Sequence, residues 1–192
     1  MSTPAADGLP FTGDPEADAL LASEPLALLI GFVLDQQVTV QKAFSGPLEL
    51  RRRLGTLDAS HIAGMDPAAL KEVFRARPAL HRFPGNMARR TQELCRAVTE
   101  RYDGRAERVW QDASSGRELE ARLLDLPGIG PLKARSLVAI LVKRFGVSPD
   151  GWQDVMPDHP TLADVDSAET LAAYQAQKRA AKQRLRGLDT AS

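Results

Sequence analysis

A tight turn with two glycines, set between two helical segments, constrains this chain more than any other feature of its 192 residues. It lies in the stretch Leu126-Pro-Gly-Ile-Gly-Pro-Leu-Lys-Ala134. Glycine adopts positive φ without strain and lets another backbone approach closely, so Gly128 and Gly130 suit a sharp reversal between helices. We therefore predict a helical hairpin over residues 117–145, with Ile129 packed between its two arms.

The end of this turn also suits an anion. A helix begins after the second glycine, where free N–H groups and the helix dipole favour negative charge. Pro131 fits the first turn of that helix, because its missing N–H would have no partner there. We expect the turn to contact a phosphate backbone through four residues: Gly128, Ile129, Gly130 and Lys133. The alternative is a plain helical hairpin whose glycines only form the turn.

The rest of the chain shows helical patterns, and no alternating strand pattern stands out, so we predict an all-α fold. Pro25 precedes an apolar segment, Leu26–Leu34, that has no polar face, which predicts a buried central helix. Phe44 continues the apolar pattern beyond this segment, and we expect the pattern to stop at Gly46-Pro47. A new helix is expected to run from Pro47 to Leu54. Further helices are expected over residues 58–63, from 66–67 onward, and over 86–102, 117–126, 131–145 and 169–185.

Three regions follow from this pattern. Residues 1–16 are rich in proline and glycine and are predicted to form an extended arm, pinned by Leu9 and Phe11. Residues 17–166 form the main domain, with a loop over 146–165, and residues 167–192 form a basic C-terminal helix and tail.

Composition narrows the classes of site. The single cysteine, Cys95, excludes a disulfide within the chain, a four-cysteine zinc site and a cysteine-ligated iron–sulfur cluster. The three histidines are far apart and show no ligand spacing, so we expect no metal. No apolar run approaches the ~20 residues that cross a bilayer, so we expect a cytoplasmic protein without membrane contact.

The net charge of zero hides an asymmetry. Residues 1–70 carry nine acids and four bases, a net charge of −5, whereas residues 71–192 carry sixteen acids and twenty-one bases, a net charge of +5. A binding face is a local property, so the basic second part is compatible with nucleic acid, with a solvated helix surface as the alternative.

The chain resembles the helix-hairpin-helix DNA glycosylase superfamily, also called HhH-GPD, which includes endonuclease III and the 8-oxoguanine and 3-methyladenine glycosylases. The hairpin is the first match. Leu28-Leu-Ile-Gly-Phe-Val-Leu-Asp-Gln-Gln-Val-Thr39 is similar to the family's early helix, and Gly85–Gly104 to its helix two elements before the hairpin. The resemblance covers roughly residues 25–166. It implies two helical lobes with a cleft that receives a flipped, damaged nucleotide.

The resemblance also implies roles for single residues. Gln37, or its neighbour Gln36, matches the glutamine that probes the gap left in the duplex, and we interpret Asp35 as structural. Members with lyase activity carry a nucleophilic lysine where this chain has Leu132. Lys133 comes one residue later, which turns a helical side chain by about 100°, so we expect it to face phosphate or solvent rather than the cleft.

Members without that lysine use an aspartate to stabilise the cationic sugar. We rank Asp166 first for this role, Asp164 second and Asp158 third, with Asp150 and Asp154 as further candidates. Asp166 has a helix N-cap as its alternative role. A chain with no catalytic aspartate is also compatible with the sequence.

We therefore expect a monofunctional DNA glycosylase of base excision repair, a monomer that acts on double-stranded DNA with a damaged base and needs no cofactor. The alternatives are an inactive DNA-binding module and an interaction protein. The last helix either lies along phosphates or is an exposed tail; its cations are Lys178, Arg179, Lys182, Arg184 and Arg186. The aromatic candidates for a base pocket, with core packing as the alternative, are Trp110, Trp152, Phe32, Phe44 and Tyr102.

Overall fold

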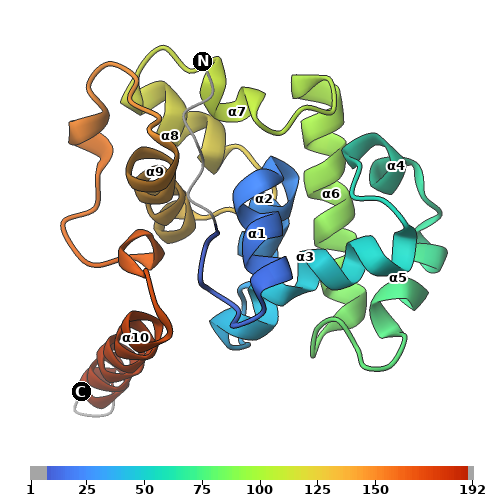
Figure 1. Ribbon diagram of the computed structural model, residues 1–192, viewed down its shortest axis with the longest axis horizontal. Coiled ribbons are helices and arrows are strands. Elements are labelled where there is room, and N and C mark those ends of the chain that lie inside the picture. Colours follow the sequence, from blue (N-terminus) through green and yellow to red (C-terminus); the bar gives the residue numbers. More distant parts are fainter. Residues whose placement is uncertain (1–7, 190–192) are drawn as a thin grey trace.

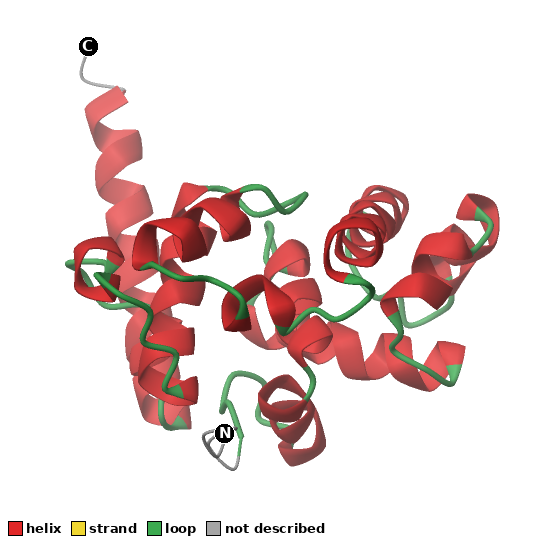
Figure 2. Cartoon of the chain, turned by 90° about the horizontal axis from the view of Figure 1, so that it is seen from above, coloured by secondary structure: helices red, strands yellow, loops and turns green. Residues whose placement is uncertain are grey.

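The computed structural model describes residues 8–189, which form ten helices and two short 3-10 turns (Figures 1 and 2). The predicted all-α class is confirmed, since this part of the chain contains no strand, only an isolated bridge between Ser115 and Asp150. The elements are α1 (Pro15–Ser23), α2 (Pro25–Leu34), α3 (Val40–Leu54), α4 (Ala59–Gly64), α5 (Pro67–Arg75), α6 (Pro84–Tyr102), α7 (Arg108–Gln111), α8 (Gly116–Leu124), α9 (Pro131–Phe145), η1 (Trp152–Val155), η2 (Leu162–Asp164) and α10 (Ala168–Asp189).

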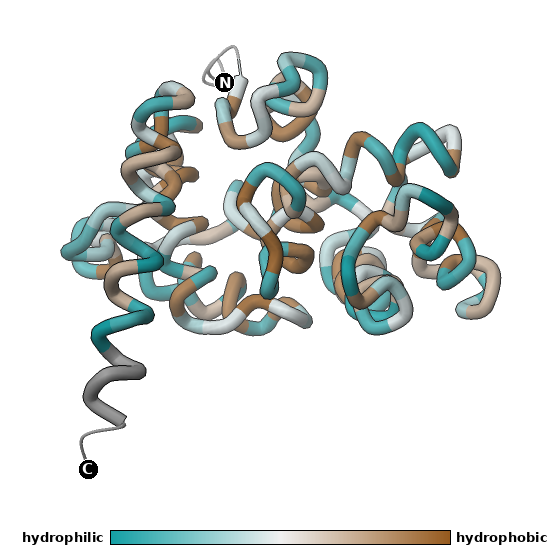
Figure 3. Tube along the Cα trace, turned by 90° about the horizontal axis from the view of Figure 1, so that it is seen from below, coloured by the Kyte–Doolittle hydropathy of each residue, from teal (hydrophilic) through white to brown (hydrophobic). Residues whose placement is uncertain are grey.

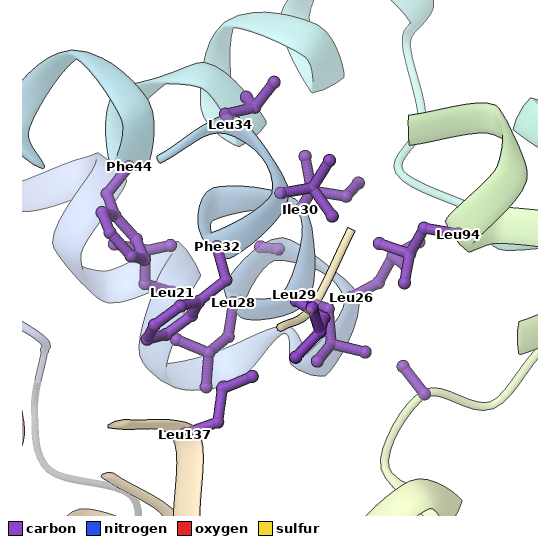
Figure 4. Close-up of a cluster of buried hydrophobic side chains, with 14 of the residues drawn as sticks. Leu21, Leu26, Leu28, Leu29, Ile30, Phe32, Leu34, Phe44, Leu94 and Leu137 are labelled. Carbon is purple, nitrogen blue, oxygen red and sulfur yellow. The ribbon is translucent and has the colours of Figure 1, made fainter. Parts of the chain in front are cut away.

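Helix α2 lies at the centre of the molecule, with α8 and α9 on one side and α6 on the other (Figure 1). Nine of its ten residues are buried, as expected for a helix that is apolar on every face. Phe32 meets Phe44 of α3 edge-on, with ring centroids 5.2 Å apart. Leu94 of α6 and Leu137 of α9 belong to the same cluster of buried side chains (Figure 4). The prediction of a buried central helix is therefore confirmed, and α2 joins the two sides of the fold.

The predicted break at Gly46-Pro47 is wrong, because α3 runs without interruption from Val40 to Leu54. Proline inside a helix removes one backbone hydrogen bond and crowds the preceding turn. Here both residues are buried, and a Cβ on Gly46 would lie only 2.4 Å from Cδ1 of Leu34. Close packing of α3 on α2 thus outweighs the local cost of Pro47, as tertiary packing commonly outweighs helix propensity.

Other element boundaries follow the sequence pattern closely. The hairpin helix α9 has the predicted bounds, and Pro25 is the first residue of α2. Helix α6 begins at Pro84, two residues before its predicted start at residue 86, because proline is tolerated in the first turn. Helix α7, four residues long, was not predicted, since one turn carries no periodic signal.

The two ends of the described chain differ in how they are held. Leu9 and Phe11 are fully buried, so the predicted pinning of the arm is confirmed. The arm is shorter than the predicted residues 1–16, because α1 already begins at Pro15, and residues 1–7 lie outside the described residues. Helix α10 projects from the body and is largely hydrophilic (Figures 2 and 3). It is attached through buried Leu171 and through a hydrogen bond of 2.6 Å from Nε2 of Gln175 to Oε1 of Gln41.

Within residues 8–189, no single helix is long and apolar enough to cross a membrane. Helices α1 and α2 meet the length and composition test only when taken together, across a bend of 114°. The apolar residues of both helices are packed in the core.

Candidate functional site

The hairpin has the geometry that its sequence predicts. Gly128 has φ of 84°, in the region that favours glycine, and Ile129 is buried. Gly130 is the N-cap of α9 and offers no side chain to cap it. The backbone N–H groups of Leu132 and Lys133, in the first turn of α9, therefore have neither a side-chain cap nor an acceptor within the helix. This end of α9 can accept an anion through its amides and its dipole.

Helix α2 fixes the position of the turn. A Cβ added to Gly128 would lie 3.2 Å from Cγ2 of Val33, so glycine is needed for close approach as well as for its φ. The amide of Ile129 donates to the carbonyl of Leu126 at 3.1 Å and closes the turn. The amide site thus lies beside the C-terminal half of α2.

A cavity of about 480 Å³ opens between α2, the start of α9, the segment before η2, and α10. This volume lies within the range of ligand pockets, about 300–1,000 Å³. Its lining residues are Phe32, Asp35, Leu132, Lys133, Ser136, His159, Pro160, Thr161, Leu162, Tyr174, Gln177, Lys178 and Ala181. Of the aromatic candidates from the sequence, Phe32 alone lines this cavity, and Tyr174 was missed.

The expected direction of the Lys133 side chain is wrong. Lys133 and Leu132 both line the cavity, but Lys133 is half-buried, whereas Leu132 is 77% exposed. The reason is helical geometry: residue 133 shares a face of α9 with Ser136 and Leu137, three and four residues later, and that face points inward. Burial lowers the pKa of Lys133, and the charge of Asp35 partly opposes this shift.

Asp35 is the carboxylate in the lining of this cavity. It is the C-cap of α2, its side chain is 11% exposed, and Oδ2 lies 3.6 Å from Nζ of Lys178 on α10. Burial, together with the nearby Asp35 charge, raises the pKa of Tyr174. Sequence reasoning treated Asp35 as structural; the available signal was that it is the first polar residue after an entirely apolar helix.

The aspartates ranked from the sequence lie elsewhere. Asp164 pairs with Lys143 near the C-terminal end of α9, and Oδ2 accepts from the Thr161 amide at 2.9 Å. Burial raises the pKa of Asp164, but the Lys143 ammonium and the Thr161 hydrogen bonds outweigh it and hold the pKa below its ordinary value. Ten residues separate Lys133 from Lys143, so about 15 Å of helix lies between their Cα atoms.

Asp166 and Asp158 are both exposed and do not line the cavity. Asp166 accepts a hydrogen bond of 3.0 Å from the Thr170 hydroxyl. The alternative role of Asp166 as N-cap belongs instead to Ser167, whose hydroxyl accepts from the Thr170 amide at 3.2 Å, because Ser167 directly precedes α10. Asp158 contacts its neighbour His159 at 3.1 Å. The further candidates, Asp150 and Asp154, are exposed near η1, away from this lining.

The two glutamines after α2 differ in their surroundings. Gln37 is exposed and has φ of 55°, one of two positive values among the non-glycine residues that the structure describes. Oε1 of Gln36 accepts a hydrogen bond of 2.7 Å from Arg90, and the backbone carbonyl oxygen of Gln36 lies 3.1 Å from Nε2 of His81. Gln37 is thus the residue free to meet another molecule, while Gln36 holds the turn to α6.

The described cations of the last helix, Lys178, Arg179, Lys182 and Arg184, are exposed, and the side chain of Arg186 lies outside the described residues. Within residues 8–189, no group of three or more His, Cys, Asp or Glu side chains is placed to hold a metal ion.

The chain was also compared with known proteins. A family model described as "HhH-GPD superfamily base excision DNA repair protein" matches residues 30–189, which include the second half of α2, the hairpin, the residues that line the cavity, and α10. No curated protein and no solved structure matches the chain significantly. The family match covers well over half of the 192 residues. The chain therefore belongs to the HhH-GPD superfamily of base excision DNA repair proteins.

Proposed function

We propose that the protein is a DNA glycosylase that hydrolyses the N-glycosidic bond of a damaged base in double-stranded DNA, without lyase activity. The observation that carries this proposal is that the amide site of the hairpin and the cavity share residues 132 and 133. A phosphate bound at the start of α9 brings the adjoining nucleotides next to a cavity of about 480 Å³. An unstacked nucleotide can enter there without a change of fold.

Hydrolysis rather than lyase chemistry is supported by Leu132, which stands where the resemblance places a nucleophilic lysine. Lys133 nevertheless lines the cavity, so its amine makes the proposal testable. Borohydride reduction of the protein with abasic DNA is expected to trap no covalent product. A trapped band that disappears in Lys133→Ala would show a Schiff base and contradict the hydrolytic assignment.

The activity itself is tested with duplexes that each carry one lesion, followed by alkali to cut at abasic sites. We expect cleavage at alkylated purines first, because a cationic base is already a good leaving group. An undamaged duplex of the same sequence is the control. A protein that binds these duplexes but cleaves none is an inactive DNA-binding module, the second candidate. That candidate is favoured by one observation, namely that Asp166, Asp164 and Asp158 all lie outside the cavity.

We further propose that the protein acts as a monomer in the cytoplasm. Sedimentation of the protein with a short duplex is expected to give a complex of one chain per duplex. A stoichiometry of two chains per lesion would contradict this.

A further inference from the structure

The proposed hydrolysis needs an anion beside the reacting sugar, and the cavity contains one that the sequence did not suggest. Breaking the bond between C1′ and the base builds positive charge on the sugar, and a fixed carboxylate in a partly dry site stabilises that charge better than water does. We propose that Asp35 is this carboxylate. The inference rests on the proposed glycosylase activity and assigns the anion within it.

Placement is the first argument. Asp35 is the carboxylate in the lining of the cavity, where Lys133 of the hairpin also lies. Its side chain is 11% exposed, so its charge is only weakly screened by solvent. It is also the C-cap of α2, and the negative end of the helix dipole adds to the potential that a cation at this point would meet.

The availability of its oxygen atoms is the second argument. The carboxylate of Asp164 is occupied by the Thr161 amide and Lys143, and that of Asp166 by the Thr170 hydroxyl. Among the described residues, the one charged partner of the Asp35 carboxylate is Lys178, at 3.6 Å, which is longer than a hydrogen bond. An entering nucleotide can replace this ammonium without breaking a close contact, because Lys178 is an exposed side chain on α10.

A third observation indicates that the cavity is formed for a polar ligand. The hydroxyl of Ser136 lines it, the residue is only 9% exposed, and Oγ has no hydrogen-bond partner in the described structure. A buried hydroxyl without a partner costs free energy, which a ligand oxygen or nitrogen recovers. Ser136 lies one turn after Leu132 on α9, beside the amide site.

The hydrolysis that Asp35 would assist needs no co-reactant other than water. For an alkylated purine, the bond between C1′ and the base breaks, and its electron pair leaves with the base, which becomes neutral. The oxygen of a water molecule then forms a bond to C1′, and the carboxylate of Asp35 accepts one proton from that water before releasing it to solvent. The products are an abasic sugar, the free base and a proton.

The test compares single-turnover cleavage by the full chain and by matched variants, using the most rapidly cleaved lesion. Asp35→Asn removes the charge with little change in shape and is expected to lower the rate roughly 10²-fold or more, while binding of the duplex stays nearly parental. Asp166→Asn makes the same chemical change outside the cavity and is expected to cleave at close to the parental rate. Parental cleavage by Asp35→Asn would overturn the inference and leave the glycosylase proposal intact. A parent that cleaves no lesion would overturn both.

Two further variants separate a catalytic carboxylate from a structural ion pair. Lys178→Gln removes the partner of Asp35 and is expected to lose far less activity than Asp35→Asn. Asp35→Glu keeps the charge and is expected to retain more activity than Asp35→Asn. Should Asp35→Asn fail to fold, Lys178→Gln still decides the question, because it removes the ion pair and keeps the carboxylate; its loss is expected to stay well below the roughly 10²-fold that removal of the anion would cause. A loss of that size in Lys178→Gln would assign Asp35 to a structural ion pair.

Discussion

His81 is the residue whose protonation state most directly affects the turn after α2. It is buried, Nε2 lies 3.1 Å from the carbonyls of both Leu34 and Gln36, and Nδ1 accepts from the Phe83 amide at 3.0 Å. This pattern requires the neutral ring, since imidazolium has no acceptor for an amide. Burial lowers the pKa of His81 from its ordinary value of 6.5, and the two carbonyls only partly oppose the shift.

A pH dependence of stability follows from this shift. Because the pKa of His81 is lower in the folded than in the unfolded chain, the unfolded chain binds more protons in the window between the two values. The contribution of His81 to stability is therefore complete above pH about 6.5 and declines as the pH falls below it. We expect the melting temperature of the parent to fall between pH 7 and 5.5, and that of His81→Gln to fall less. Equal slopes would contradict the assignment; His61→Gln, at an exposed position, is the control.

At the scale of elements, the hairpin allows binding and stability to be changed in opposite directions. Gly130 has ordinary φ of −90° and open space where a Cβ would lie, unlike Gly128. An aspartate at this N-cap can accept from the first turn of α9 and is expected to raise stability by about 0.5 kcal/mol. Its charge occupies the amide site, so Gly130→Asp is expected to weaken duplex binding by about fivefold, independently of sequence.

The neutral variant Gly130→Ser separates charge from capping. The serine hydroxyl caps the helix in the same way, so Gly130→Ser is expected to have a melting temperature equal to or higher than that of the parent. It is expected to bind DNA more tightly than Gly130→Asp, because it adds no negative charge. Gly128→Asp is a poorer test, because positive φ and Val33 both oppose a side chain there. Binding of Gly130→Asp at parental affinity, with the fold retained, would show that the hairpin does not contact DNA phosphates.

The sequence predicts elements better than it predicts the site. Periodicity and capping identify α2 and α9 because each carries a long, uniform signal. The cavity is formed by residues from α2, α9 and α10, far apart in the chain, and no local pattern reports how such faces meet. Lys133 was misplaced for this reason, since its direction depends on which face of α9 packs inward. The sequence motif favoured Asp166 as the catalytic carboxylate, whereas the position of α2 beside the cavity favours Asp35.

At the scale of the whole molecule, exposed cations lie on both sides of the fold, although the net charge is zero. The exposed cations Lys182 and Arg184 lie on α10, at the opposite side from α5, which carries exposed Lys71 and Arg75 (Figure 1). Removing one cation that binds a phosphate lowers the slope of log affinity against log salt by about 0.9. The double variant Lys182→Gln/Arg184→Gln is expected to lower the slope by up to about 2, and Lys71→Gln/Arg75→Gln to leave it unchanged. A slope in Lys182→Gln/Arg184→Gln equal to that of the parent would exclude α10 from the DNA-binding face.

The connection between α2 and α3 joins surface and interior over three residues. Asp35 lines the cavity, Gln36 is bonded to Arg90, and Gln37 projects to solvent with positive φ. Successive Cα atoms are 3.8 Å apart, so the exposed amide side chain and the largely buried carboxylate belong to backbone positions within about 8 Å. If Gln37 contacts DNA, as the resemblance implies, this contact and the proposed catalytic carboxylate are positioned by the same short turn, whose backbone and side chains bond to His81 and Arg90.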